Sequence, residues 1–295
     1  MMKKLMLIIN PAAGRAGYKN DFAEAMELLD QSGYRVTAYF TGGPGDAGRF
    51  AETEGMNYDV IVCAGGDGTL SDTISGLMKL DNPPPLGYFS QGTANDVATT
   101  LGIPKNNSYL SAQAFLSGTS HPYDIGQFGD RYFAYVAAFG AFTEVSYATP
   151  QNQKKALGHL AYVLQGAASL GKIEPIHARV EFDDGVIESD FLYGGMSNST
   201  SIAGLVKLPE EMVSLGDGIS ELVLVKDPGS VDGIAQILNA VISRTFNSDK
   251  LIILHTRHAK FTFDRPVAWT CDGEAGGEHL EVELKNIPRP VNLLF

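Results

Sequence analysis

The sequence has 295 residues, of which 44% are hydrophobic and 19% are charged, and its formal net charge is −12. This length favours two domains, and the composition is typical of a soluble globular protein. The negative charge argues against a general nucleic-acid or anionic-membrane binder, because both partners would repel the protein, so any membrane contact must use a local patch. The two cysteines, Cys63 and Cys271, lie far apart in apolar surroundings, so they indicate neither a disulfide framework nor a zinc site.

The amino-terminal apolar run covers residues 5–9 and ends at Asn10-Pro11. It is too short for a signal peptide, and no other apolar run approaches the length of a membrane span. We therefore expect a first β-strand and a cytoplasmic protein.

Up to residue 101 the chain alternates between strand-like and helix-like patterns. This alternation predicts βαβ units and a parallel sheet, with ligands bound in the loops that follow the strands. The expected strands cover residues 5–9, 35–40, 60–63 and 86–90, and the expected helices cover residues 21–32, 46–54 and 69–79.

A glycine-rich turn, AGGDGTL at residues 64–70, directly follows a buried strand. Three glycines allow a close approach of the backbone to a ligand, and the start of the next helix favours a phosphate. Asp67 in this turn would be repelled by a polyphosphate unless a divalent cation lay between them. Asp67 is therefore either a metal-organising acid or a residue that caps its own turn, and the turn alone leaves both readings open.

Three other loops follow the predicted strands. Residues 10–14 form a turn of small residues, and residues 91–98 lead into a helix that Thr93 or Asn95 could cap, with Asp96 in its first turn. Residues 41–48 match the dinucleotide pattern G-x-G-x-x-G, but this loop follows the second strand and contains a proline. A plain helix entry is the better interpretation there.

The pattern changes near residues 117–122, where we place a domain boundary in a loop. Helical patterns at 152–170 and 231–242 favour packing against a sheet, although Lys154 and Lys155 leave a membrane-facing role open for the first. Asp-Gly and Gly-Asp turn signals predict hairpins and a sandwich-like antiparallel domain. The expected strands cover residues 132–138, 177–182, 186–193, 221–225, 251–256, 259–263 and 280–284.

No Ser-His-Asp or Cys-His arrangement and no metal-ligand spacing of histidines is legible. Glycine-rich loops with acids at one sheet edge instead favour phosphoryl transfer, which depends on positioning and metal electrostatics.

Four motifs together resemble the bacterial diacylglycerol kinase-like lipid kinases, which share a catalytic domain with eukaryotic diacylglycerol, sphingosine and ceramide kinases. The motifs are NPAAG at 10–14, GGDGT at 65–69, GTAND at 92–96 and DGE at 272–274. The resemblance covers nearly the whole chain. It implies an ATP-binding α/β domain with a parallel sheet at residues 1–122, and a mainly antiparallel β-sandwich domain for the lipid substrate at residues 123–295.

The resemblance also assigns roles to residues. Asp67, Asp96 and Asp124 would form a carboxylate and water network around the catalytic Mg²⁺, and Glu274 would take the proton from the lipid hydroxyl. A structural Mg²⁺ site would use Asp217 and the backbone carbonyls of Ser214 and Ile219, where a hairpin turn explains Asp217 equally well. The implied ATP contacts are Asn10, Pro11, Ala12, Ala13, Gly14, Thr41, Gly65, Gly66, Asp67, Gly68, Thr69 and Thr93.

The chain departs from the family pattern at Ser71-Asp72, where relatives usually have Asn-Glu, so the acid is kept on a shorter side chain. An NAD kinase-like activity and a non-catalytic nucleotide- or lipid-binding regulator are the alternatives to a lipid kinase. The acceptor lipid cannot be read from generic apolar residues. A peripheral membrane contact through Lys154, Lys155 and Lys172 is expected, no nucleic-acid partner is expected, and a homodimer remains open.

Overall fold

A computed structural model describes residues 2–13, 19–92, 95–141, 174–199, 201–202, 206–207, 213–243 and 248–295. The chain divides into two compact units. The first unit combines Met1–Ile125 with Pro288–Phe295, and the second is Gly126–Ile287. No helix in the described segments is long and apolar enough to cross a membrane.

The first unit is built on parallel strands in the order β2-β1-β3-β4. Its strands are β1 (Lys3–Ile9), β2 (Tyr34–Phe40), β3 (Val60–Gly65) and β4 (Leu86–Ser90). Its helices are α1 (Lys19–Gln31), α2 (Asp46–Glu54), the 3₁₀ turn η1 (Gly55–Asn57), α3 (Asp67–Leu77), α4 (Asp96–Leu101) and α5 (Ser108–Ser117).

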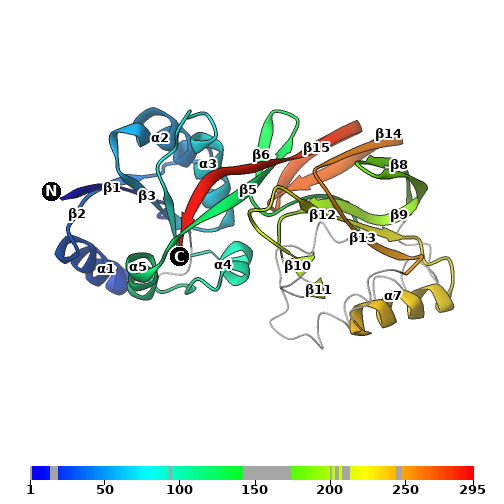
Figure 1. The fold of residues 1–295 in the computed structure, drawn as a ribbon, viewed down its shortest axis with the longest axis horizontal. Helices are drawn as coiled ribbons and strands as arrows, with labels where there is room; N and C mark the ends of the chain where they lie inside the picture. The colour runs from blue at the N-terminus through cyan, green and yellow to red at the C-terminus, as the bar shows by residue number, and fades with distance from the viewer. Residues whose placement is uncertain are drawn as a thin grey trace. The chain divides into compact units, whose positions relative to one another are not determined.

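Helices cover both faces of these strands (Figure 1). Alternate residues of β1, such as Leu5 and Leu7, share a core with Ala25 and Leu29 of α1. In Figure 1, α1 and α5 lie together on one side of the sheet, and α2 and α3 lie together on the other. A sheet buried on both faces explains why β1 and β3 are continuous apolar runs. Because the strands are parallel, the loops that follow β1, β3 and β4 reach the same edge.

The second unit is rich in antiparallel strands around an aromatic core that includes Phe139, Phe261 and Trp269. The amino-terminal α/β unit and the β-rich carboxy-terminal unit match the predicted order of the two domains. The elements that start in or enter this part of the chain are β5 (Ser120–Phe128), β6 (Arg131–Phe133), β7 (Val136–Gly140), β8 (Ile176–Phe182), β9 (Gly185–Ser197), β10 (Ser201–Ile202), β11 (Val206–Lys207), β12 (Ser220–Lys226), α7 (Val231–Ser243), β13 (Leu251–Thr256), β14 (His258–Cys271) and β15 (Glu274–Leu294).

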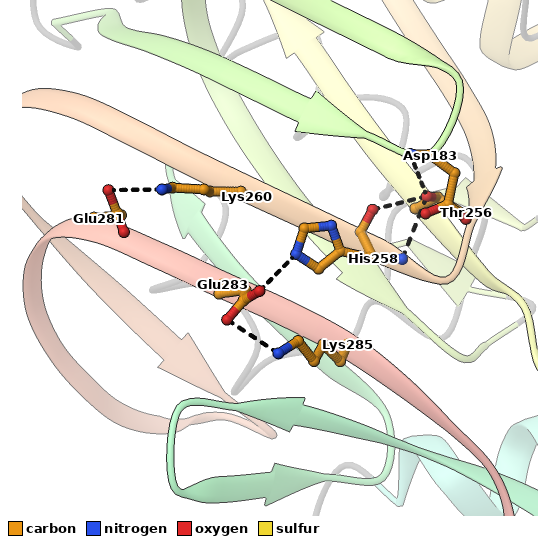
Figure 2. Close-up of polar contacts among 7 residues, drawn as sticks. All are labelled: Asp183, Thr256, His258, Lys260, Glu281, Glu283 and Lys285. Carbon is orange, nitrogen blue, oxygen red and sulfur yellow. Dashed lines mark hydrogen bonds and ion pairs between the residues drawn. The ribbon is translucent and has the colours of Figure 1, made fainter.

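Charged side chains occupy the solvent side of β14 and β15. Figure 2 shows Glu283 between His258 and Lys285, at 2.8 and 3.1 Å, and Lys260 paired with Glu281 at 3.0 Å. These ion pairs are exposed to water, so each contributes little to stability. They show instead which face of the strands is solvated, since the apolar residues on the same strands point into the core.

The domain boundary differs from the prediction in two respects. The expected loop at 117–122 is wrong, because β5 begins at Ser120 and runs through Pro122. The chain end also returns to the first unit, where Leu293 pairs in parallel with Leu86 and the amide of Thr119 donates to the carbonyl of Phe295 at 3.1 Å. Residues 123–125 and 288–295 therefore belong to the amino-terminal unit, and not to a carboxy-terminal domain of residues 123–295 as predicted.

Candidate active site

The loops after β1 and β3 are joined by Asn10. Its backbone amide donates to the carbonyl of Ala64 at 2.9 Å, and its side-chain amide donates to Thr69 Oγ1 at 2.9 Å. Its side-chain oxygen accepts from the amide of Ala12 at 3.0 Å, which shapes the turn that contains Pro11 and Ala13. The side chain of Asn10 thus fixes the turn at residues 10–13 against the start of α3.

The glycine turns after β3 and β4 approach each other so closely that side chains do not fit between them. A Cβ atom on Gly92 would lie 2.7 Å from the Cα of Gly66, and a Cβ atom on Gly65 would lie 2.5 Å from Thr69 Oγ1. The amide of Gln91 also donates to the carbonyl of Gly65 at 2.7 Å. Glycine is therefore required at these positions by packing, and the result is a surface made of backbone at the sheet edge.

Asp67 begins α3 and faces the start of α4. Its carboxylate accepts from the amides of Asp96 at 3.1 Å and Val97 at 3.4 Å, and from the hydroxyl of Tyr88 at 3.4 Å. Burial raises the pKa of Asp67 above its ordinary value, although these hydrogen bonds to the charged form oppose the shift. Burial also holds the pKa of Tyr88 well above its usual range, so Tyr88 remains a hydrogen-bond donor. A cation beside Asp67 would favour its ionised form.

Asn95 holds the turn after β4. It is fully buried, its φ is 54°, and its side chain both accepts from the amide of Gly92 and donates to the carbonyl of Gly92, each at 2.8 Å. The sequence indicated only a choice of caps between Thr93 and Asn95. The observed role of Asn95 is to close the turn on Gly92, which sets the path of the backbone that passes Gly66.

Asp96 and Asp124 occupy different settings in the same unit. Asp96 is the first residue of α4, and its amide is bound to Asp67. Asp124 is fully buried in β5, where its Oδ1 atom accepts from the amide of Arg289 at 2.7 Å. Within the described residues, no three His, Cys, Asp or Glu side chains form a group that could hold a metal ion. The three predicted carboxylates are thus not gathered into a ready-made cation cage.

In the G-x-G-x-x-G loop after β2, backbone amides donate hydrogen bonds to carboxylates of the protein. Asp46 accepts from the amides of Gly42 and Gly43 at 2.8 and 3.1 Å, and Asp72 accepts from the amide of Gly45 at 2.8 Å. This arrangement agrees with the interpretation of the loop as a helix entry. It also gives Asp72 a structural partner. At the start of this loop, the amide of Thr41 donates to the carbonyl of Ile9 at 2.9 Å, which places Thr41 beside the end of β1.

Glu274 and the predicted structural metal residues belong to the second unit. Glu274 is exposed and begins β15 directly after the two-residue turn Asp272-Gly273. Asp217 is also exposed, and its Oδ1 atom accepts from the amide of Ile219 at 3.0 Å, as in an ordinary Asx turn. Several predicted residues lie outside the described residues: Gly14, Thr93, Lys154, Lys155 and Lys172.

Both cysteines are buried and free, as expected. Burial raises the pKa of the Cys63 thiol to about 12, so this group beneath the glycine-rich turn stays protonated. Cys63 therefore supplies no nucleophile to the candidate site.

The chain is similar to known proteins over its whole length. A family model described as "Diacylglycerol kinase catalytic domain" matches residues 4–128. Diacylglycerol kinase of Bacillus subtilis (strain 168) is 32% identical over 295 residues, which cover 100% of this chain and 97% of the relative. Diacylglycerol kinase of Staphylococcus aureus (strain bovine RF122 / ET3-1) is 31% identical over 304 residues, covering 99% of this chain and 92% of the relative.

A solved structure of a diacylglycerol kinase from Bacillus anthracis str. Sterne has a TM-score of 0.76 at 20% identity, and the match covers 99% of this chain and 97% of that chain. This similarity supports the fold, with its amino-terminal domain and β-rich carboxy-terminal domain. The full-length similarity to the curated relatives shows that the chain belongs to the diacylglycerol kinase family.

Proposed function

We propose that this protein is an ATP- and Mg²⁺-dependent lipid kinase that transfers the γ-phosphate to a hydroxyl of diacylglycerol or a similar lipid. The observation that carries the proposal is the meeting of the loops after β1, β3 and β4 around Asp67, through the bonds of Asn10 and Asp96. The names of the relatives from B. subtilis and S. aureus support the lipid as the acceptor class. In this proposal the parallel-sheet unit binds the nucleotide and the second unit, a β-sandwich, binds the lipid.

The backbone surface at Gly65, Gly66 and Gly92 fits a polyphosphate. The two turns touch each other, and because these positions carry no side chains, phosphate oxygens would approach the backbone amides at this edge directly. Gly68 and Thr69 continue this surface into α3. The family resemblance adds residues 10–14, Thr41 and Thr93 to the nucleotide contacts.

The single half-buried carboxylate of Asp67 fits a catalytic Mg²⁺. Proteins commonly bind Mg²⁺ with one or two carboxylates while the nucleotide phosphates and several waters complete its octahedral shell. A three-carboxylate cage is therefore not needed, and Asp96 and Asp124 would contribute through bound water. When bound, Mg²⁺ would neutralise the charge of the phosphates.

Glu274 is the proposed general base. Its carboxylate would take the proton of the lipid hydroxyl as that oxygen forms a bond to the γ-phosphorus, and the bond to the β-phosphate oxygen would break to release ADP. An exposed carboxylate at a hairpin tip is accessible to an incoming alcohol. Asp217, with the carbonyls of Ser214 and Ile219, is proposed as a separate structural Mg²⁺ site.

The lipid acceptor implies work at a membrane surface. We propose a cytoplasmic protein that binds the membrane peripherally, with Lys154, Lys155 and Lys172 as the contact, and a homodimer as an assembly to be tested. Charge reversal at these lysines should weaken binding to anionic vesicles, as measured by sedimentation, and unchanged binding and lipid turnover would contradict the lysine patch.

The direct test is transfer of labelled γ-phosphate from ATP to diacylglycerol, phosphatidylglycerol, sphingosine and ceramide in mixed micelles, with NAD as a soluble acceptor. Asp67→Ala should abolish transfer to lipid. Asp59→Ala is the matched control, because Asp59 is exposed and accepts from the amide of Lys4 near the amino-terminal end of the strands, so its loss should leave transfer unchanged. Label on NAD alone, or full activity of Asp67→Ala, would contradict the proposal.

A further inference from the structure

The segment between β6 and β7 binds the carboxylate of Asp272 with successive backbone amides. Asp272 Oδ2 accepts from the amide of Ala134 at 2.7 Å, and Oδ1 accepts from the amides of Tyr135 and Val136, both at 2.9 Å. Successive amides that converge in this way form a concave anion site, and hydrogen bonds to a carboxylate are about twice as strong as neutral ones. A side chain of the protein itself occupies this anion site.

Asp272 also forms the turn that presents Glu274. Cys271 pairs with Glu274 across β14 and β15, which leaves a two-residue loop of Asp272 and Gly273 with φ values of 49° and 82°. Positive φ at both residues is typical of a type I′ hairpin turn. The amide of Asp272 donates to the carbonyl of Val136 at 2.8 Å, so both the backbone and the side chain of this turn are tied to the same segment.

Arg131 binds the backbone on the other side of Glu274, at the start of β15. Its Nη1 atom donates to the carbonyl of Ala275 at 3.1 Å, and Ala275 is the residue that follows Glu274. The charges at the tip act on the nearby Cys271 thiol, whose pKa is raised mainly by burial, then by Asp272 and Glu274, while Arg131 lowers it. Residues of the 131–136 segment thus bind the chain on both sides of Glu274, at Asp272 and at Ala275.

We propose that Asp272 and Arg131 are positioning residues for Glu274, a role that rests on the proposed function of Glu274 as the base. Neither residue needs to touch the substrate. Asp272 sets the direction of the hairpin tip through the amides of residues 134–136, and Arg131 restrains the carbonyl next to Glu274. A displacement of about 1 Å in a catalytic group can cost on the order of 100-fold in rate, so loss of the Asp272 carboxylate should be felt in kcat.

The test is a double-mutant cycle in the full chain, with lipid phosphorylation by labelled ATP as the readout. Asp272→Asn keeps the side-chain volume but places an amide donor against backbone donors. It should lower kcat by roughly 10- to 100-fold with little change in the KM for ATP. In a Glu274→Gln background the same change should alter kcat by less than about 2-fold, because the group that it positions has already been removed.

Two further variants separate positioning from folding. Arg131→Gln alters an exposed residue and should lower kcat by about 2- to 10-fold in the native background only, as expected for the loss of one hydrogen bond. Asp183→Asn is the matched control. Asp183 lies at the β8–β9 hairpin beside Thr256 (Figure 2) and accepts from the amide of Arg257 at 2.8 Å, so its change should leave kcat unaltered.

Each outcome bears on one claim. Full activity of both Asp272→Asn and Arg131→Gln, or an equal loss of kcat with and without Glu274, would overturn the positioning role alone. An equal fall in kcat for Asp183→Asn would show that general destabilisation is responsible, and would overturn it as well. Absence of lipid phosphorylation by the unaltered protein would overturn the proposed function, and the positioning role with it.

Discussion

Gly48 of α2 and Gly76 of α3 bring the backbones of these two helices into contact. A Cβ atom on Gly76 would lie 2.1 Å from the carbonyl oxygen of Gly48 and 2.9 Å from its Cα. Ordinary contacts between such atoms are about 3.5 Å, so Gly76→Ala requires the helices to separate by more than about 1 Å. A rotamer change cannot relieve this clash, because every atom involved belongs to the backbone or is a Cβ.

Two effects of Gly76→Ala oppose each other. Alanine is a better helix former than glycine by about 0.5–1 kcal/mol, whereas overpacking at a close contact costs about 1–3 kcal/mol or more. Because the overlap is with rigid backbone, we expect the cost of overpacking to exceed the gain in helix propensity. The free energy of unfolding of the first unit should then fall by about 1–2 kcal/mol. For a unit of this size, that loss lowers Tm by roughly 3–10 °C. α3 begins at Asp67, so its displacement should also reduce phosphate transfer.

The assay exploits the single tryptophan, Trp269, which lies in the second unit. Far-UV circular dichroism during urea unfolding is weighted toward the first unit, because α1 to α5 lie there while α7 is the one described α-helix of the second unit, and Trp269 fluorescence reports the second unit. Gly76→Ala should shift the first transition and leave the second unchanged. Gly43→Ala is the control, because a Cβ atom there would have no neighbour within 4 Å, and its effect should stay within about 0.5 kcal/mol. A Gly76→Ala protein as stable as the native one would refute the close helix contact.

The remaining predictions concern the two proposed catalytic carboxylates. Because burial raises the pKa of Asp67, the folded state binds this proton more tightly than the unfolded state. The resulting stability is fully present below the unfolded pKa of about 3.9 and is lost as pH rises through the raised pKa. Asp67→Asn should therefore lose less stability than the native protein between acid and neutral pH in urea unfolding, and identical pH dependences would contradict this. Glu274→Ala should bind ATP normally by calorimetry but lower lipid turnover by roughly 100- to 10,000-fold, and full turnover would remove its assigned role.

The first unit could be predicted closely from the sequence. The strand expected at 60–63 is β3 (Val60–Gly65), and the helix expected at 46–54 is α2 (Asp46–Glu54). These elements are legible because strands buried on both faces are continuous apolar runs and the intervening helices are amphipathic. The predicted convergence of loops follows from the same topology, since parallel strands deliver their carboxyl ends to one edge.

The sequence was less informative where long-range contacts decide the local structure. The strand expected at 132–138 is interrupted between β6 and β7, because Ala134 and Tyr135 direct their amides to Asp272 and not to a neighbouring strand. No local pattern marks this break, since Ala134 and Asp272 are separated by 138 positions. β5 was missed for a different reason, because Pro122 is usually a sign against a strand.

Some polar residues of the family motifs also make hydrogen bonds that stabilise the fold. The motifs could be recognised from the sequence, but the geometry of these bonds could not. Asn95 closes the turn on Gly92, and Asp272 closes the break between β6 and β7. Both residues have a positive φ, where a side chain is strained unless its hydrogen bonds compensate. Asp272 is therefore fixed by a partner distant in the sequence, whereas Asn95 is fixed by a local bond within its own turn. The primary effect of substituting either residue should be a changed path of the backbone at the site, and any change in substrate contacts should follow from it.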